Sequence, residues 1–438
     1  MNWTQLDRKY VWHPFTQMLT APPPLPVERA EGVYLYTVDG RKILDGISSW
    51  WVNTHGHSHP RLNRALEGQA AKLQQVIFAG FTHEKAARLA AELVEVTPRG
   101  LGHVFYSDDG STSVEVALKM ATQYWQMRGE RRRDLFVALE HAFHGDTFGA
   151  MAAGGIPAFH EAFRPLLFEV CRAPAPYSYA FDRGVDPQAC EAHCRKALEE
   201  ILRRDAERVA AVIIEPMLQG AGGMIVWPPA YLRAVRQLCD EYGVLLIADE
   251  VFTGFGRTGK LFACEHGPVE PDILCVSKAL TGGYLPLAAT LSTDAVYEAF
   301  LSEDRGKTFF HGHSFTGNAL SCAVALENLA IFKDEKPLER IAELEELFGH
   351  RLERLRAIPG VGEARGIGLL AAVELETREG GGYLDDVGPR LADEFLRRDI
   401  LLRPLGNVLY FLPPYVITDE EAHSVFDAIE EVLAELDG

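Results

Sequence analysis

Residues 245–283, LLIADEVFTGFGRTGKLFACEHGPVEPDILCVSKALTGG, are the most informative part of the sequence for the fold. This stretch contains two short apolar runs of the kind expected for strands buried on both faces. Asp249 ends the first run, and Lys278 ends the second, 29 positions later, which leaves room for one crossover connection. Ligands of open α/β sheets bind beyond the carboxyl ends of the strands, so both side chains are candidates for one site. Taken alone, the pair is better explained as a buried salt bridge.

The segments on either side alternate between strand and helix patterns. The runs at 103–108 and 209–216 are strand-like, whereas 112–127 and 229–243 have helical periodicity. This alternation predicts an α/β domain with a mostly parallel sheet.

After residue 330 the pattern changes to a long helix, 338–358, followed by two strand-like runs, 368–376 and 407–414. We therefore expect three parts: an N-terminal segment, 1–60, that packs with the small domain, a large domain, 61–330, and a smaller α+β domain, 331–438.

The chemistry of pyridoxal 5′-phosphate (PLP) explains the Asp249–Lys278 pair better than a salt bridge does, if a phosphate site is also present. A lysine that attacks an aldehyde should lose its charge, which burial favours. The pyridine nitrogen must stay protonated for the ring to accept electrons, and a neighbouring carboxylate keeps it so.

A phosphate site is plausible where a strand, 103–108, is followed by Gly110-Ser111-Thr112 and a helix. A helix N-terminus presents free N–H groups, and hydroxyls of Ser111 and Thr112 add donors. A simple Ser/Thr cap explains this segment equally well. Phe143, on a turn after another apolar strand, could stack on a pyridine ring, although a packed loop aromatic is the simpler interpretation.

Two other patterns do not indicate a site. Residues 254–259 match GxGxxG, but no strand precedes them directly, no long helix follows, and Leu261 stands where a phosphate loop needs Ser or Thr. We interpret them as a Gly-rich loop that places Arg257 beside the site. The histidine pairs lack a ligand pattern for a metal, so we predict none, with His313 as a possible active-site residue.

Composition bounds the function. The 438 residues carry a formal net charge of −19, which disfavours binding to nucleic acid. No apolar run is long enough to span a membrane, and the N-terminus lacks the layout of a signal peptide. The seven cysteines are scattered in apolar segments, as in a protein of a reducing compartment. We expect a cytoplasmic protein.

The whole chain resembles the class III, or ω-, aminotransferases, PLP enzymes of fold type I. The long segment 245–283 carries the resemblance, together with WHPFTQM, DGISSWWVNTHGHSHP, ALKMATQYWQMRGE, HGDTFGAM, EPMLQGAGGM and HGHSFTGN. It implies a transaminase with small-molecule substrates, and a homodimer with shared active sites. It further resembles a biotin-pathway branch of the family, whose keto substrate has a long methylene chain that ends in a carboxylate.

The resemblance implies that Lys278 forms the Schiff base with PLP and that Asp249 partners the pyridine nitrogen. The other implied cofactor-binding residues are Gly110, Ser111, Phe143 and, from the neighbouring subunit, Ser314. The implied substrate-binding residues are Phe15, Trp50, Phe143, Gly312, His313 and Arg403. Arg403 would bind the substrate carboxylate, while Phe15, Trp50 and Trp51 cover the methylene chain.

The chain departs from the family pattern at three places. Phe143 and Phe15 stand where many members have tyrosine, and His313-Ser314 replaces a Pro-Thr found in some. These changes leave the amino donor open between S-adenosylmethionine and lysine. The alternatives are another class III enzyme acting on ornithine, 4-aminobutyrate or β-alanine, a mutase that uses the same cofactor, and a non-enzymatic PLP-binding protein.

Overall fold

The computed structural model describes residues 2–177, 179, 186–377 and 381–436. Its centre is a seven-stranded sheet with the order β4-β12-β11-β10-β7-β5-β6. Only β12 runs antiparallel to its neighbours in that sheet. The strands are β4 (Leu101–Ser107), β5 (Leu135–Leu139), β6 (Val170–Ala173), β7 (Val209–Ile214), β10 (Leu245–Asp249), β11 (Ile273–Val276) and β12 (Ala288–Thr293). The prediction of a mostly parallel sheet is confirmed.

The central strands are buried because both faces of the sheet are covered by helices. All residues of β7 and β10 are buried, as their near-continuous apolar sequence requires. The helices of the large domain are α3 (Pro60–Ala70), α4 (Glu84–Val96), α5 (Gly110–Met127), α6 (Phe148–Ala153), α7 (Pro157–His160), α9 (Pro187–Asp205), α10 (Pro229–Tyr242), α11 (Asp294–Glu298) and α12 (Ala319–Asp334). Short 3₁₀ turns, η1 (Glu161–Leu166), η2 (Ala263–His266), η3 (Lys278–Thr281) and η4 (Arg305–Lys307), and the hairpin β8 (Leu218–Gln219) and β9 (Ile225–Val226) complete it.

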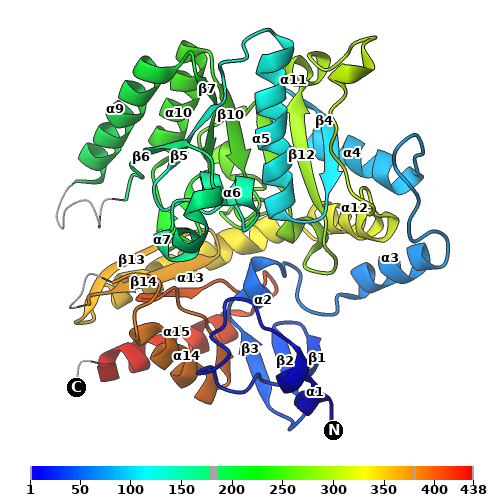
Figure 1. The fold of residues 1–438 in the computed structure, drawn as a ribbon. Helices are drawn as coiled ribbons and strands as arrows, with labels where there is room; N and C mark the ends of the chain where they lie inside the picture. The colour runs from blue at the N-terminus through cyan, green and yellow to red at the C-terminus, as the bar shows by residue number, and fades with distance from the viewer. Residues whose placement is uncertain (1, 178, 180–185, 378–380, 437–438) are drawn as a thin grey trace.

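The C-terminal part forms a separate layer below the large sheet in Figure 1. Its antiparallel sheet has the order β13-β14-β16, and the two predicted strand-like runs, 368–376 and 407–414, contain β14 and β16, which pair with each other. The elements are α13 (Pro337–Leu355), β13 (Val361–Ile367), β14 (Leu370–Leu375), α14 (Val387–Arg397), β15 (Ile400–Leu401), β16 (Val408–Phe411) and α15 (Asp419–Leu436).

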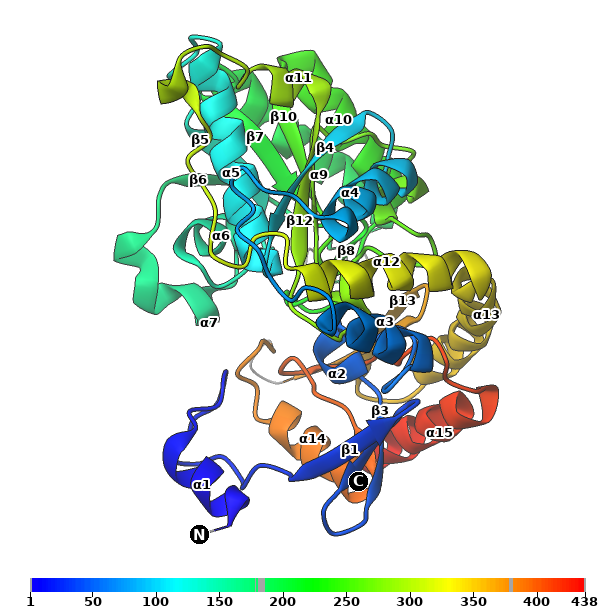
Figure 2. The ribbon, with the colours of Figure 1, turned by 90° about the vertical axis from the view of Figure 1, so that its right-hand side faces the viewer.

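The N-terminal elements lie against this small layer (Figure 2). They are α1 (Trp3–Tyr10), β1 (Val27–Glu31), β2 (Tyr34–Thr37), β3 (Lys42–Asp45) and α2 (Ser48–Trp51). Strand β3 pairs in parallel with β15, and Leu44 and Trp51 belong to the same apolar core as β14 and α15. The N-terminal segment therefore packs with the small domain. The division into 1–60, 61–330 and 331–438 stays a proposal, and its last boundary falls inside α12, which lies between the layers (Figures 1 and 2).

None of the helices in the described ranges combines the length and apolar character needed to cross a lipid bilayer.

Candidate active site

A cavity of about 460 Å³ opens at the carboxyl ends of the central strands. Asp249 ends β10, and Lys278 follows β11 by two residues, so the parallel pairing of these strands brings both side chains to one edge. The predicted residues that line this cavity together are Trp51, Gly110, Ser111, Phe143, Asp249 and Lys278. Asp249 and Lys278 therefore lie in one cavity at the carboxyl ends of the strands, as the sequence predicted.

Lys278 does not continue its strand. The strand stops at Val276, two residues earlier than predicted, and Lys278 adopts a left-handed backbone with φ 46° at the start of η3. Its ammonium lies over the ring of Trp51, 4.7 Å from the centroid, and near Phe252 at 5.3 Å. Burial lowers the pKa of Lys278 to about 8, Asp249 and Glu215 oppose this shift, and Arg257 adds to it.

Asp249 is held by a buried histidine. Its Oδ2 lies 2.7 Å from Nδ1 of His144, and its Oδ1 accepts a hydrogen bond of 3.1 Å from the amide of Val251. The other ring nitrogen of His144 is buried without a partner among the described residues. Both carboxylate oxygens are thus oriented, which fixes how the group faces the cavity.

Glu215 is a site residue that the sequence analysis missed. It directly follows β7, lines the cavity, and accepts hydrogen bonds of 3.0 Å from the amides of Phe143 and Gly220. Burial raises the pKa of Glu215 to about 7. The sequence contained the signal, because Glu215 is the charged residue that follows the apolar residues of the run 209–216, as Asp249 does in its own run.

The opposite end of the cavity is an anion cradle. Gly110 and Ser111 are the first residues of α5, so their amides have no intrahelical acceptor and lie at the positive end of the helix dipole. A Cβ at Gly110 would meet Val251 at 2.4 Å, so the backbone approaches too closely for any side chain. Thr147 closes the cradle, with its amide donating to the hydroxyl of Ser111 at 3.0 Å.

Thr112 does not contribute the hydroxyl that we expected. Its Oγ1 donates to the carbonyl of Asp109 and accepts from the amide of Asp109, while the Asp109 carboxylate accepts from the amide of Thr112. This capping box occupies the Thr112 side chain. The expectation of a Thr112 donor to the phosphate is therefore wrong.

A strained turn presents the two tryptophans. The residues Ser48, Ser49, Trp50 and Trp51 all have φ between 47° and 77°. Such a conformation costs roughly 1–2 kcal/mol for each L-residue, so the turn needs support. The buried carboxylate of Asp45 supplies it, accepting 2.9 Å and 2.7 Å hydrogen bonds from the amide and hydroxyl of Ser49.

Trp50 and three phenylalanine rings form a continuous wall. Phe15 packs edge-on against Trp50 at 5.7 Å and against Phe159 at 5.3 Å, and Phe159 in turn packs against Phe143 at 6.0 Å. The guanidinium of Arg403 lies 4.3 Å from the centroid of the Trp50 ring. Phe159 was not predicted, because an aromatic residue in a short helix gives no sequence signal of a site.

None of the other predicted residues lines the cavity of its own chain, and this includes Phe15, Trp50 and Arg403. Gly312, His313 and Ser314 belong to a partly exposed loop and do not line it. Arg257 is buried behind it, donating to the carbonyls of Asn53 and Pro413. In the described part of the chain, no group of three or more His, Cys, Asp and Glu is arranged to hold a metal.

The cavity fits PLP by its chemistry. It combines an amine of lowered pKa, an oriented carboxylate, a flat aromatic side chain and a helix N-terminus that suits a phosphate. Together, the fold and the chemistry of this cavity define a PLP-dependent enzyme.

Comparison with known proteins gives the class. The model of the aminotransferase class-III family matches residues 17–433, and the chain therefore belongs to this family. It is a PLP-dependent aminotransferase. It is 45% identical, over 99% of its length and 97% of the relative's, to the adenosylmethionine-8-amino-7-oxononanoate aminotransferase of Geobacter sulfurreducens.

Solved structures agree with this assignment. The enzyme of the same name from Methanocaldococcus jannaschii superposes with a TM-score of 0.92 at 40% identity, covering 99% of this chain and 98% of the other. An ω-transaminase of Pseudomonas jessenii in complex with PMP superposes with a TM-score of 0.94 at 30% identity, with coverage of 99% and 98%. The predicted fold type I is confirmed.

The lowered pKa of Lys278 predicts how the apoenzyme captures PLP. Only the neutral amine attacks an aldehyde. With a pKa of about 8, the neutral fraction of Lys278 increases about tenfold with each unit of increasing pH up to pH 8, and it levels off at higher pH. The rate of covalent capture, followed by stopped-flow absorbance, should rise in the same way. A rate that keeps rising steeply up to pH 10 would show that Lys278 titrates like an exposed lysine.

Proposed function

We propose that this enzyme transfers an amino group to 8-amino-7-oxononanoate and yields 7,8-diaminononanoate in biotin biosynthesis. The names of the relatives support this substrate. The observation that carries the proposal is the aromatic wall from Phe143 to Trp50, with Arg403 stacked on Trp50. A methylene chain can lie along such a wall while its carboxylate meets a guanidinium.

Different residues of the chain would bind the cofactor and transfer the proton. Gly110 and Ser111 would hold the phosphate of PLP, Phe143 would lie against the ring, and Asp249 would keep the pyridine nitrogen protonated. When bound, PLP withdraws electrons from the carbon that carries the amino group. Lys278 moves the proton of that carbon, first as a base and then as an acid, and its weakened basicity suits both directions.

Phe143 and Phe15 offer rings without hydroxyls to the substrates. We propose that both contact the apolar part of the keto substrate, and that neither contributes a hydrogen bond to it. Gly312 and His313 would contact substrate from the neighbouring subunit.

We propose a homodimer in which Ser314 of one chain reaches the cofactor phosphate of the other. Ser314 lies outside the cavity of its own chain. Large apolar side chains on and near its loop are exposed: Ile77 by 61%, Phe81 by 63%, Phe310 by 74% and Phe315 by 58%. A face of this kind is typical of a protein interface.

We further propose a cytoplasmic location. All seven cysteines are free in the structure, which suits a reducing compartment.

Arg403→Ala tests the keto substrate. Loss of a charged two-donor contact to the carboxylate should raise the KM for 8-amino-7-oxononanoate by roughly 10–100-fold, with a smaller effect on kcat. Arg403→Lys keeps the charge without the planar fork, so its KM for the keto substrate should lie between those of the original enzyme and of Arg403→Ala. Arg403→Ala should leave the KM for the amino donor unchanged. If Arg403→Ala also left the KM for the keto substrate unchanged, Arg403 would be excluded as the partner of the substrate carboxylate.

The amino donor is tested by half-reactions. The purified holoenzyme is mixed with S-adenosylmethionine, lysine, ornithine or 4-aminobutyrate alone, and the absorbance of the cofactor is followed. We propose S-adenosylmethionine or lysine as the donor, and the one that converts the cofactor fastest identifies it. Rapid conversion by ornithine or 4-aminobutyrate only, without turnover of 8-amino-7-oxononanoate, would replace the biotin-pathway proposal by another ω-aminotransferase activity.

A further inference from the structure

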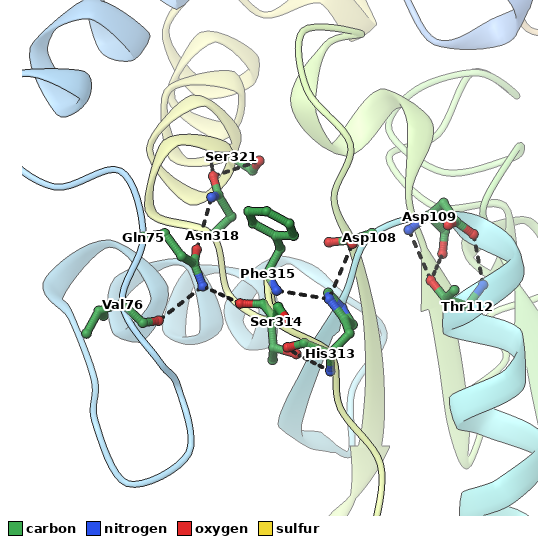
Figure 3. A network of polar contacts seen from close by, with 11 residues as sticks. Gln75, Val76, Asp108, Asp109, Thr112, His313, Ser314, Phe315, Asn318 and Ser321 are labelled. Atoms are coloured by element: carbon green, nitrogen blue, oxygen red, sulfur yellow. Dashed lines mark hydrogen bonds and ion pairs between the residues drawn. The ribbon is translucent and has the colours of Figure 1, made fainter.

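A glutamine from a different segment, Gln75, is hydrogen-bonded to the loop that contains Ser314 (Figure 3). Nε2 of Gln75, in the connection between α3 and α4, donates a hydrogen bond of 2.9 Å to the carbonyl of Ser314. The side chain of Ser314 is exposed, and its hydroxyl makes no hydrogen bond to any residue that the structure describes. The backbone of Ser314 is therefore fixed while its hydroxyl stays available.

The carboxamide of Gln75 uses its other hydrogen-bonding positions as well. Its Nε2 also donates to the carbonyl of Val76 at 3.1 Å, and its Oε1 accepts from Nδ2 of Asn318 at 3.0 Å. Asn318 is itself the cap of α12, since its Oδ1 accepts 3.1 Å hydrogen bonds from the amides of Leu320 and Ser321. Gln75 thus ties the loop to the rigid start of a long helix.

A second anchor holds the other side of Ser314. Nδ1 of His313 lies 3.3 Å from Oδ2 of Asp108, as Figure 3 shows. Asp108 directly precedes Asp109, which caps α5 and so begins the anion cradle of this chain. The loop is fixed on both sides of Ser314 by residues that are remote in the sequence.

We propose that Gln75 is a positioning residue for the cofactor site of the partner subunit. It holds the backbone of Ser314 so that the hydroxyl projects toward the phosphate bound by the other chain. This inference rests on the proposed homodimer with a shared site. A hydroxyl on an exposed loop binds a phosphate well only if its position is fixed beforehand, because otherwise binding must also order the loop.

A double-mutant cycle tests this role by the affinity of the full-length apoenzyme for PLP. Ser314→Ala removes the hydroxyl and should weaken binding about tenfold, as expected for one hydrogen bond to a charged group. Gln75→Met keeps the size of the side chain but not its hydrogen bonds, and should weaken binding severalfold. The double variant should bind no more weakly than Ser314→Ala alone, because Gln75 acts through Ser314.

Gln74→Met is the matched control. Gln74 is the exposed neighbour of Gln75, and no hydrogen bond of its side chain occurs among the described residues, so PLP affinity should not change. Sedimentation of each variant shows whether the assembly is intact.

The outcomes separate the two proposals. If Ser314→Ala weakens binding but Gln75→Met does not, or if the two effects multiply in the double variant, the positioning role of Gln75 is overturned and the shared site stands. If Ser314→Ala leaves PLP affinity unchanged, the shared site fails, and the role of Gln75 fails with it.

Discussion

Lys278→Ala is expected to lower the turnover of both substrates by at least about 10³-fold, because one amine serves as nucleophile and as proton carrier. Lys278 is the only lysine among the residues that line the described cavity. The variant should also lose the covalent form of the bound cofactor, which is detected by reduction with borohydride followed by mass spectrometry. Its fold should persist, since removing the amine also removes the unfavourable burial that lowers its pKa.

Lys260→Ala is the control for this prediction. Lys260 lies in the same stretch of sequence, residues 245–283, but it is exposed and does not line the cavity. Its variant should keep full activity and the covalent cofactor. Turnover of Lys278→Ala at more than a few per cent of the original rate would refute the assigned role.

Asp249→Asn should have the second largest effect, a loss of roughly 10²–10³-fold in kcat. The amide has the shape of the carboxylate but no charge, so it does not stabilise a protonated pyridine nitrogen. Losing the charged partner of a buried cation typically costs about 3–5 kcal/mol, which corresponds to this range of rates or more. The asparagine oxygen can still accept from the amide of Val251, so the local backbone should be unchanged.

Glu270→Gln is the control for Asp249→Asn. It makes the same chemical change at an exposed position shortly before β11. Steady-state kinetics at saturating concentrations of both substrates separates the two variants. If Asp249→Asn kept nearly the original kcat, the carboxylate would be a structural partner of His144 and not of the cofactor.

The strand ends of the site could be predicted from sequence, because a strand that is buried on both faces has a nearly continuous apolar sequence. An apolar run broken by a charged residue shows both the strand and its end, as at Asp249. The same rule would have found Glu215 after β7, had it been applied to every strand.

Other parts of the site left no such mark. The left-handed turn from Ser48 to Trp51 is stabilised by Asp45 from the preceding strand, and no local preference of Ser or Trp predicts it. Phe159 joins the aromatic wall only through packing between distant segments. Thr112 was wrongly predicted as a phosphate donor, because its hydroxyl group instead makes hydrogen bonds that cap its own helix.

The central claim is that Lys278 and Asp249 face one PLP ring whose phosphate lies at the start of α5. A crystal structure of the holoenzyme tests it most directly. We expect PLP joined to Nζ of Lys278, its ring nitrogen within hydrogen-bonding distance of the Asp249 carboxylate, and its phosphate at the amides of Gly110 and Ser111. A cofactor bound to another lysine, or with its phosphate away from Gly110, would contradict the account.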